Sequence, residues 1–235
     1  MATTIEALPG EILCLIFKEV PPYTIRCVVL TCRHWEKLIP VEERPTLENS
    51  FWDAAAGGHV SLLELYREWG ANDFDEALVD AAEKGQVEVM ELLQGWGATS
   101  FDRALLYAAR SGHLDAMTLL WGWGATNFDK ALILAAQEGH QEAMCLLLGW
   151  GATDYNRAMV AAVICGQPEA MTLLKEWGAR ILEWLFGMAA RFGQLEAMTL
   201  LKEWGSTDFD GAMRLAVENE QQEAVKLLEG WIKEG

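Results

Sequence analysis

Apolar residues recur along most of this chain at spacings of one, three and four, which place them on one face of an α-helix. Residues 101–127 contain two such stretches, separated by Gly112. Their members are Ala104, Leu105, Ala108 and Ala109, followed by Ala116, Met117, Leu119 and Leu120. Glycine is favoured just past a helix end, where the backbone is left-handed. The pattern therefore predicts two helices joined by a tight turn.

This two-helix pattern recurs every 27 residues, as a column of tryptophans shows. The column consists of Trp69, Trp96, Trp123, Trp150, Trp177, Trp204 and Trp231. One helical hairpin cannot bury its own apolar face, so successive copies are expected to stack into a solenoid. We interpret the tryptophans as stacking contacts in the core. The alternative, a platform for a ligand, stays open.

Threonines mark the expected starts of several first helices. Thr99 and Thr126 precede Asp102 and Asp129 by three residues. This spacing is typical of a capping box, in which a Thr caps the helix and an acidic residue sits three positions later. The aspartates are accordingly predicted to be helix caps rather than catalytic groups.

The repeated residues resemble those of ankyrin repeats. The matching motifs are Ala-Ala-x-x-Gly-His at 108–113 and 135–140, Ala-Met-x-Leu-Leu at 116–120 and Gly-Ala at 124–125, and the resemblance covers residues 47–232. Ankyrin units are about 33 residues long and open with Thr-Pro-Leu-His, whereas residues 103–106 are Arg-Ala-Leu-Leu. The missing residues fall where ankyrin repeats form a β-hairpin. The expected fold is therefore all-α, a helical-hairpin solenoid of about seven units with few or no β-hairpins.

The first forty residues have a different pattern, with a helix predicted around 10–19 and a break at Pro21-Pro22. Residues 8–38 resemble an F-box, through Leu8-Pro9, Glu11-Ile12, Ile16-Phe17, Leu30, Cys32-Arg33, Trp35 and Leu38. The resemblance implies a three-helix motif that docks on the Skp-family adaptor of a Skp–cullin–F-box ubiquitin ligase. The adaptor contacts that it implies are Leu8, Pro9, Ile12, Ile16, Phe17 and Trp35, some of which could pack inside the motif. The alternative is an unrelated helical cap on the solenoid.

These assignments predict an F-box at residues 1–42 and an ankyrin-like solenoid at 43–235. The short tryptophan-bearing units also resemble those of giant DNA virus proteins that join ankyrin repeats to an F-box.

Variable positions opposite the alanines are candidates for binding a target protein. In the middle repeats they are basic or apolar, although the rest of the chain is acidic. The candidates are Arg103, Tyr107, Arg110, Lys130, Leu134, Arg157, Trp184, Met188 and Arg191. Tyr, Trp and Arg often anchor protein interfaces. The alternative is a surface on which charge varies by chance.

The net charge of −17 lies in the repeats, because the charges of residues 1–40 cancel. An acidic body repels phosphate backbones, so no nucleic-acid partner is expected. The longest uncharged run, 116–128, is too short to cross a bilayer, and no membrane partner is expected. The five cysteines include no CxxC pair, which favours a reducing, intracellular location, cytoplasmic or nuclear, in a host cell if the protein is viral.

Candidate chemistry is sparse. The four histidines are scattered, and the sequence contains no defensible Ser-His-Asp order and no phosphate-binding glycine loop. We expect no enzyme activity, no cofactor and no metal site.

The sequence thus predicts a substrate-recognition adaptor of a ubiquitin ligase, which binds a Skp-family adaptor and an unknown target and is otherwise monomeric. The alternative is an ankyrin-type binding scaffold or decoy without ubiquitin transfer.

Overall fold

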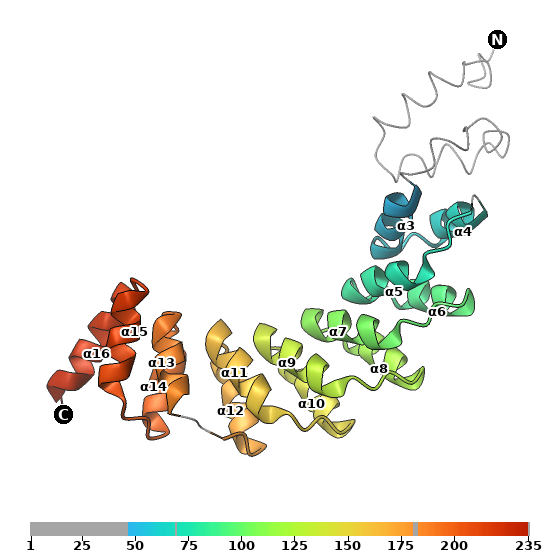
Figure 1. The fold of residues 1–235 in the computed structure, drawn as a ribbon. Helices are drawn as coiled ribbons and strands as arrows, with labels where there is room; N and C mark the ends of the chain where they lie inside the picture. Colours follow the sequence, from blue (N-terminus) through green and yellow to red (C-terminus); the bar gives the residue numbers. More distant parts are fainter. Residues whose placement is uncertain (1–46, 69, 181–182, 235) are drawn as a thin grey trace, which may run out of the picture. The chain divides into compact units, whose positions relative to one another are not determined.

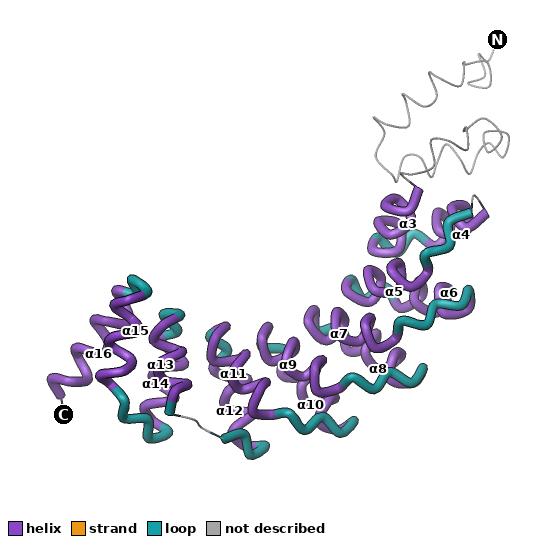
Figure 2. The backbone as a smooth tube through the Cα atoms, viewed as in Figure 1, coloured by secondary structure: helices purple, strands orange, loops and turns teal. Residues whose placement is uncertain are grey.

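The computed structural model describes residues 47–68, 70–180 and 183–234, all of it helices and connecting loops without a strand. The chain divides into two compact units, Met1–Ser100 and Phe101–Gly235, which are described separately. Figures 1 and 2 show the helices as successive antiparallel pairs. The prediction of an all-α fold without β-hairpins is confirmed for these ranges. None of the described helices is long and apolar enough to span a bilayer.

Each repeat consists of a first helix, a tight turn, a second helix and a loop that carries Trp-Gly. In the first unit the helices are α3 (Leu47–Ala56), α4 (Val60–Glu68), α5 (Phe74–Glu83) and α6 (Val87–Gly95). In the second unit they are α7 (Phe101–Ser111), α8 (Leu114–Gly122), α9 (Phe128–Glu138), α10 (Gln141–Gly149), α11 (Tyr155–Cys165), α12 (Pro168–Glu176), α13 (Trp184–Arg191), α14 (Leu195–Glu203), α15 (Phe209–Glu218) and α16 (Gln222–Glu234).

Small side chains hold successive first helices together. In α7 and α9, Ala104, Ala108, Ala131 and Ala135 are fully buried. Because alanine adds only a methyl group, α9 packs closely on α7 and on α11, and α13 packs closely on α15, whereas α11 and α13, like the second helices, are less closely packed. The second helices seal the other side of the core with a buried Ala-Met pair and a Leu, as in Ala116, Met117 and Leu120. The alanine pattern therefore positions α7, α9 and α11 as one closely packed row.

Two separate features of the turns require glycine: the backbone conformation and the lack of space for a side chain. Gly139 and Gly166 have φ angles of +78° and +67°, a left-handed conformation that glycine adopts without strain. In addition, a Cβ atom on Gly139 would lie 3.0 Å from the side-chain carbon Cδ of Gln167, which belongs to the next repeat. A Gln or His thus lies over the turn of the preceding repeat and leaves no room for a side chain there. Glu220 occupies the same column at φ +58°, and no repeat follows it in the described ranges.

The capping-box prediction is wrong, and the reason is a contact between repeats. The threonines lie one residue before the N-cap, which is Asn127 for α9 and Asp154 for α11. Asp129 accepts hydrogen bonds from the backbone N–H groups of Thr153 and Asp154, at 2.6 and 3.0 Å. Asp102 does the same for Thr126 and Asn127. Each aspartate therefore holds the loop of the following repeat, not the start of its own helix.

The two N–H groups also set the protonation of this carboxylate. The hydrogen bond from the backbone of Thr153 is the largest cause of the lowered pKa of Asp129. Burial opposes it with the next largest effect, and the hydrogen bond from Asp154 lowers the pKa further. A lowered pKa in the folded state stabilises the protein at pH values above the unfolded-state pKa of about 3.9. This contribution is lost as the pH falls through the lower folded-state value.

We expect Asp129→Ala to lower the free energy of unfolding by about 1–2 kcal/mol at pH 7, because two backbone donors lose a charged acceptor. Asp129→Asn should cost less, since Asn156 accepts a bond from the backbone N–H of Arg180 at the equivalent position. The stability gap between wild type and Asp129→Ala should shrink below about pH 4. Thermal melting at pH 7 and about pH 3 measures both effects.

Asp210 supplies the matched control for this prediction. It occupies the same column in the last repeat, and no following loop in the described chain bonds to it. Asp210→Ala should therefore change the melting temperature little. A gap between wild type and Asp129→Ala that does not vary with pH would contradict the proposed role of the carboxylate.

The tryptophans stack, but they are not buried. Trp96, Trp123, Trp150, Trp177, Trp204 and Trp231 are all half-buried, and Trp69 lies outside the described residues. Three of these rings pack on the phenylalanine that begins the first helix of the same repeat. The pairs are Trp96 with Phe74, Trp123 with Phe101 and Trp150 with Phe128, at centroid distances of 5.6, 5.5 and 6.0 Å. The prediction of a stacking contact is confirmed, whereas that of a core position is wrong because the rings lie at the loop end of the second helix.

The second face of several tryptophans is covered from the preceding repeat. Lys175 lies over Trp204 at 4.3 Å and Lys202 over Trp231 at 4.4 Å, both measured from the ammonium nitrogen to the ring centroid. Trp121 stacks on Trp150 at 5.4 Å with an interplanar angle of 5°. The covering residue stands 29 positions before the tryptophan in each case. These contacts join neighbouring repeats through cation–π or aromatic stacking.

Candidate protein-binding surface

The predicted target-binding residues lie on the first helices of the second unit. We call this surface the ridge and define it as positions i, i+4 and i+7 of α7, α9, α11 and α13. It comprises Arg103, Tyr107, Arg110, Lys130, Leu134, Gln137, Arg157, Ala161, Ile164, Trp184, Met188 and Arg191. All twelve are exposed or half-buried. Because this helix face turns away from the buried alanines, the ridge is accessible without rearranging the core.

The ridge consists of three parallel rows, each with one residue per repeat. The basic row holds Arg103, Lys130 and Arg157, all exposed, and ends in Trp184, whose surface is 49% exposed. The apolar row holds Tyr107, Leu134, Ala161 and Met188, all half-buried. The mixed row holds Arg110, Gln137, Ile164 and Arg191. None of the twelve positions is acidic.

The ion pairs of Arg110 and Arg157 are long and solvent-exposed. Arg110 lies 3.9 Å from Glu138, and Arg157 lies 3.6 Å from Asp154. Exposed pairs of this kind contribute about 0–1 kcal/mol, so they leave the guanidinium groups able to exchange partners. Arg191 lies 5.8 Å from the ring of Phe192, which is 43% exposed. Arginine and aromatic surface therefore occur together at the α13 end of the ridge.

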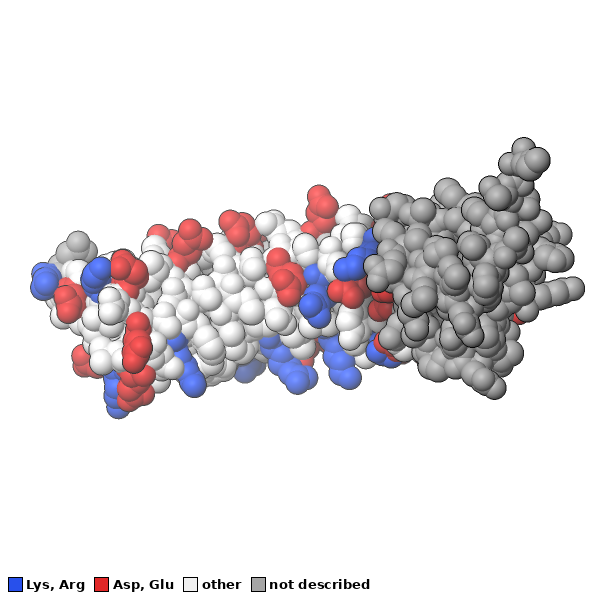
Figure 3. Space-filling model, turned by 90° about the horizontal axis from the view of Figure 1, so that it is seen from above, with Lys and Arg blue, Asp and Glu red and all other residues white. Residues whose placement is uncertain are grey.

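Charge is segregated on the surface of the repeats. In the middle of the view, Figure 3 shows a strip of uncharged side chains with Lys and Arg along one edge and Asp and Glu along the other, whereas both kinds of charge lie together at the end near the C-terminus. The ridge rows do not continue as cations in the last repeat, where the same positions are Gly211, Leu215 and Glu218. In the first unit the corresponding residues of α5 are Glu76, Asp80 and Glu83. The basic character is thus confined to α7–α13.

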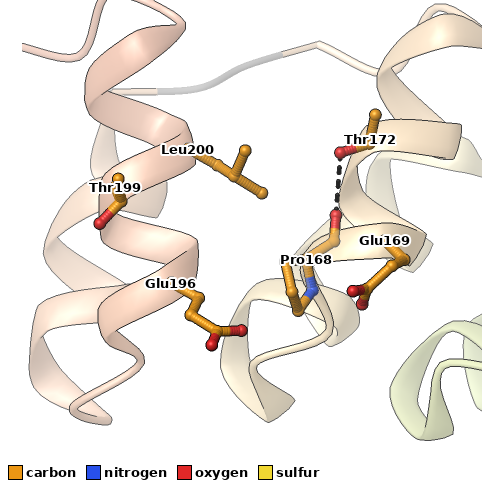
Figure 4. Close-up of a pocket in the computed structure, with 6 residues that line it drawn as sticks. All are labelled: Pro168, Glu169, Thr172, Glu196, Thr199 and Leu200. Atoms are coloured by element: carbon orange, nitrogen blue, oxygen red, sulfur yellow. Dashed lines mark hydrogen bonds between the residues drawn. The ribbon is translucent and has the colours of Figure 1, made fainter.

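A groove between second helices was not anticipated from the sequence. It has a volume of about 390 Å³ and runs between α12 and α14, and Figure 4 shows that its lining side chains come from both helices. They are Pro168, Glu169, Thr172, Glu196, Thr199 and Leu200. The groove lies where α12 and α14 pack loosely against each other. Its two glutamates make it electrostatically opposite to the ridge.

The exposed Trp121, 48% accessible, was also missed by sequence reasoning. It belongs to no repeated column, because the residues at the equivalent positions of other repeats are Lys, Arg, Gln, Leu or Glu. The sequence does contain a signal for it, because a long side chain recurs 29 residues before several tryptophans of the column, and Trp121 stands 29 residues before Trp150.

Groups suited to catalysis do not converge in the part of the chain that the structure describes. No three His, Cys, Asp or Glu side chains there form a candidate metal site. Burial, and then the nearby charge of Glu138, raise the pKa of the Cys165 thiol, which disfavours the reactive thiolate.

The implied adaptor contacts, Leu8, Pro9, Ile12, Ile16, Phe17 and Trp35, lie outside the described residues. The domain boundary predicted at residues 42 and 43 lies there too and stays a prediction.

Comparison with known proteins supports the assignments of both the N-terminal segment and the repeats. Residues 5–42 match the family model described as F-box-like. The repeats are similar in structure to the human ASB11 ankyrin repeat domain, with a TM-score of 0.58 and 22% sequence identity over 76% of this chain and 96% of that one. A comparison with curated proteins gives no match, and the resemblance to giant virus proteins stays a prediction. The chain thus combines an F-box-like domain at residues 5–42 with ankyrin-like helical repeats.

Proposed function

We propose that this chain is a substrate-recognition adaptor of a Skp–cullin–F-box ubiquitin ligase. Its F-box-like domain would dock on the Skp-family adaptor, and its ridge would hold the protein to be ubiquitinated. The observation that carries the proposal is the F-box-like match at residues 5–42 on the same chain as a repeat array with a basic and apolar surface. The chain would then supply two binding surfaces and no catalysis of its own, and would act in the cytoplasm or nucleus.

The charge distribution supports this division of labour. The ridge has five cations and no acid at its twelve positions, on a chain whose net charge is −17. Electrostatic complementarity of this kind selects partners and accelerates association. A target with acidic and apolar groups would be attracted to the ridge and repelled by most of the remaining surface.

Direct binding of a purified Skp-family adaptor to the full chain tests the docking step. We expect the double variant Leu8→Ala/Pro9→Ala to weaken adaptor binding at least about 10-fold, which corresponds to about 1.4 kcal/mol. Glu6→Gln, a neighbouring change outside the implied contacts, is the control and should bind like the wild type. Isothermal titration calorimetry gives the affinities. An adaptor that does not bind the wild-type chain would overturn the ligase assignment.

A reconstituted ligase reaction separates a productive adaptor from a decoy. A productive complex should transfer ubiquitin to lysines of this chain or of a protein that it holds. Adaptor binding without transfer to either would favour the decoy, which needs the same docking contacts but no reaction.

A further inference from the structure

The three rows of the ridge impose a spacing on any ligand that follows them. The first helices α7, α9 and α11 pack side by side in succession, and packed helices are about 8–10 Å apart. Arg103, Lys130 and Arg157 occupy equivalent positions on three such helices. The basic row therefore presents one cation about every 10 Å along the repeats.

This distance discriminates among backbone conformations of a bound segment. In an α-helix, seven residues advance about 10.5 Å and return to almost the same face, with a drift of about 20° per heptad. In a β-strand, three residues advance about 10 Å, but the third side chain points to the opposite face. A polyproline II helix advances about 9.3 Å in three residues and returns to the same face. An α-helix and a polyproline II helix can both place one carboxylate opposite each cation.

Of these two conformations, only the α-helix also fits the apolar row. Arg103 and Tyr107 are four residues apart on α7, so the basic and apolar rows are neighbours about 6 Å apart. In an α-helix, positions i and i+3 or i+4 diverge by only about 40–60° around the axis, so both lines of side chains face the same side. Adjacent rows of a polyproline II helix diverge by about 120°. Only the α-helix presents an acidic and an apolar row to the ridge together.

We propose that the ridge binds an acidic amphipathic α-helix that lies along its rows, with carboxylates at heptad spacing opposite Arg103, Lys130 and Arg157. A neighbouring line of apolar side chains contacts Tyr107, Leu134 and Met188. This inference rests on the proposed function only in taking the ridge as the surface that captures the target.

The fourth position of the basic row refines the expected ligand. Trp184 stands where α7, α9 and α11 carry a cation, and it is 49% exposed. Phe192, at the other end of α13, is 43% exposed. Exposed aromatic side chains at the end of a charged row are suited to anchoring an apolar residue. The ligand helix therefore carries three acidic heptads followed by a large apolar residue in the fourth.

A synthetic helical peptide of about four heptads, roughly 42 Å long, serves as the probe. It carries Glu at one position of three successive heptads, Leu in the adjacent row, and Trp at the fourth heptad position. One control peptide has the same composition with the glutamates moved off heptad spacing, and its helicity is matched by circular dichroism. A second control is a proline-rich peptide with Glu at every third residue.

Fluorescence anisotropy with the full chain measures the binding of all three peptides. We expect the heptad peptide to bind about 10-fold more tightly than either control, because only its glutamates are in register with all three cations. Its affinity should fall as the salt concentration rises from about 50 to about 300 mM, which shortens the screening length. Equal binding of the three peptides, or tighter binding of the proline-rich one, would overturn the proposal.

The double variant Arg103→Glu/Arg157→Glu tests the surface itself and should lower the affinity for the heptad peptide at least about 10-fold. Lys226→Glu/Lys233→Glu, on α16, is the charge-matched control, because it makes the same change in net charge at exposed positions off the ridge. Peptide affinity should be retained in this control to within about 2-fold. Melting curves of both variants establish that they fold. Peptide binding that survives in the ridge variant, or that is lost equally in both variants, would overturn the proposal.

This result is independent of the test of the ligase role. If the chain binds the adaptor through residues 5–42 but does not bind the heptad peptide, the proposal of an acidic helix as the ligand is wrong. The assignment to a ubiquitin ligase is then unaffected. Peptide binding without adaptor binding would keep the ridge and remove the ligase.

Discussion

Replacing Trp150 by alanine is expected to lower the free energy of unfolding by about 2–3 kcal/mol, somewhat less than the truncation of a fully buried tryptophan. The ring of Trp150 packs on Phe128 of its own repeat at 6.0 Å and on Trp121 of the preceding repeat at 5.4 Å. Aromatic pairs add about 0.5–1.5 kcal/mol each beyond the burial of area. Because one of the two contacts joins neighbouring repeats, its loss weakens their interface as well as the repeat itself.

Trp184→Ala provides the matched control for this prediction. Trp184 is 49% exposed, and no ring packs against it in the described structure. Its truncation should change the stability by less than about 0.5 kcal/mol and should weaken binding of the ridge peptide instead. Chemical denaturation of the two variants separates these roles. A Trp150→Ala protein that unfolds like the wild type but loses a partner would contradict the structural role of the column.

Gly166→Ala is expected to lower the free energy of unfolding by about 2–3 kcal/mol although it adds a single methyl group. The φ angle of Gly166 is +67°, and a left-handed conformation costs a residue with a Cβ about 1–2 kcal/mol. The new Cβ would also lie 2.6 Å from Cδ of Gln194. Gln194 donates a hydrogen bond to the carbonyl oxygen of Ile164 at 2.9 Å, and moving it sacrifices about 0.5–1.5 kcal/mol more.

Gly149→Ala is the control for the glycine prediction. Gly149 ends α10, and a Cβ atom there would meet nothing within 4 Å. Alanine is favoured over glycine in a helix by about 0.5–1 kcal/mol, so this variant should melt at the same or a higher temperature. Thermal melts of the two variants under one condition make the comparison. Similar melting of Gly166→Ala and wild type would show that the turn tolerates a side chain and that Gln194 does not hold it.

The sequence by itself determined the repeat and most of its local structure. Apolar spacing in residues 101–127 predicted both helices, and Gly112 predicted their left-handed turn, which has a φ angle of +73°. The absence of the ankyrin hairpin motif predicted the absence of strands in the described ranges. These features follow from the chemistry of one repeat, so one repeat is enough to reveal them.

The sequence also identified the ridge residues, because four-residue spacing places Arg103 and Tyr107 on one helix face wherever that helix lies. What it could not supply was their exposure. Trp184 and Met188 are both large and apolar, yet Trp184 is exposed and Met188 is half-buried. The difference depends on the helices that pack beside α13.

Only the tertiary structure decided which repeat each contact belongs to. Asp102 stands three residues after Thr99 and 24 residues before Thr126, and the two separations add up to the 27-residue period. The same two columns therefore fit a cap within one repeat and a bridge to the next. The structure selects the bridge, with a distance of 2.6 Å from the backbone nitrogen of Thr126 to Asp102. A periodic sequence specifies columns, whereas the pairing between columns depends on how closely the alanine-lined first helices stack.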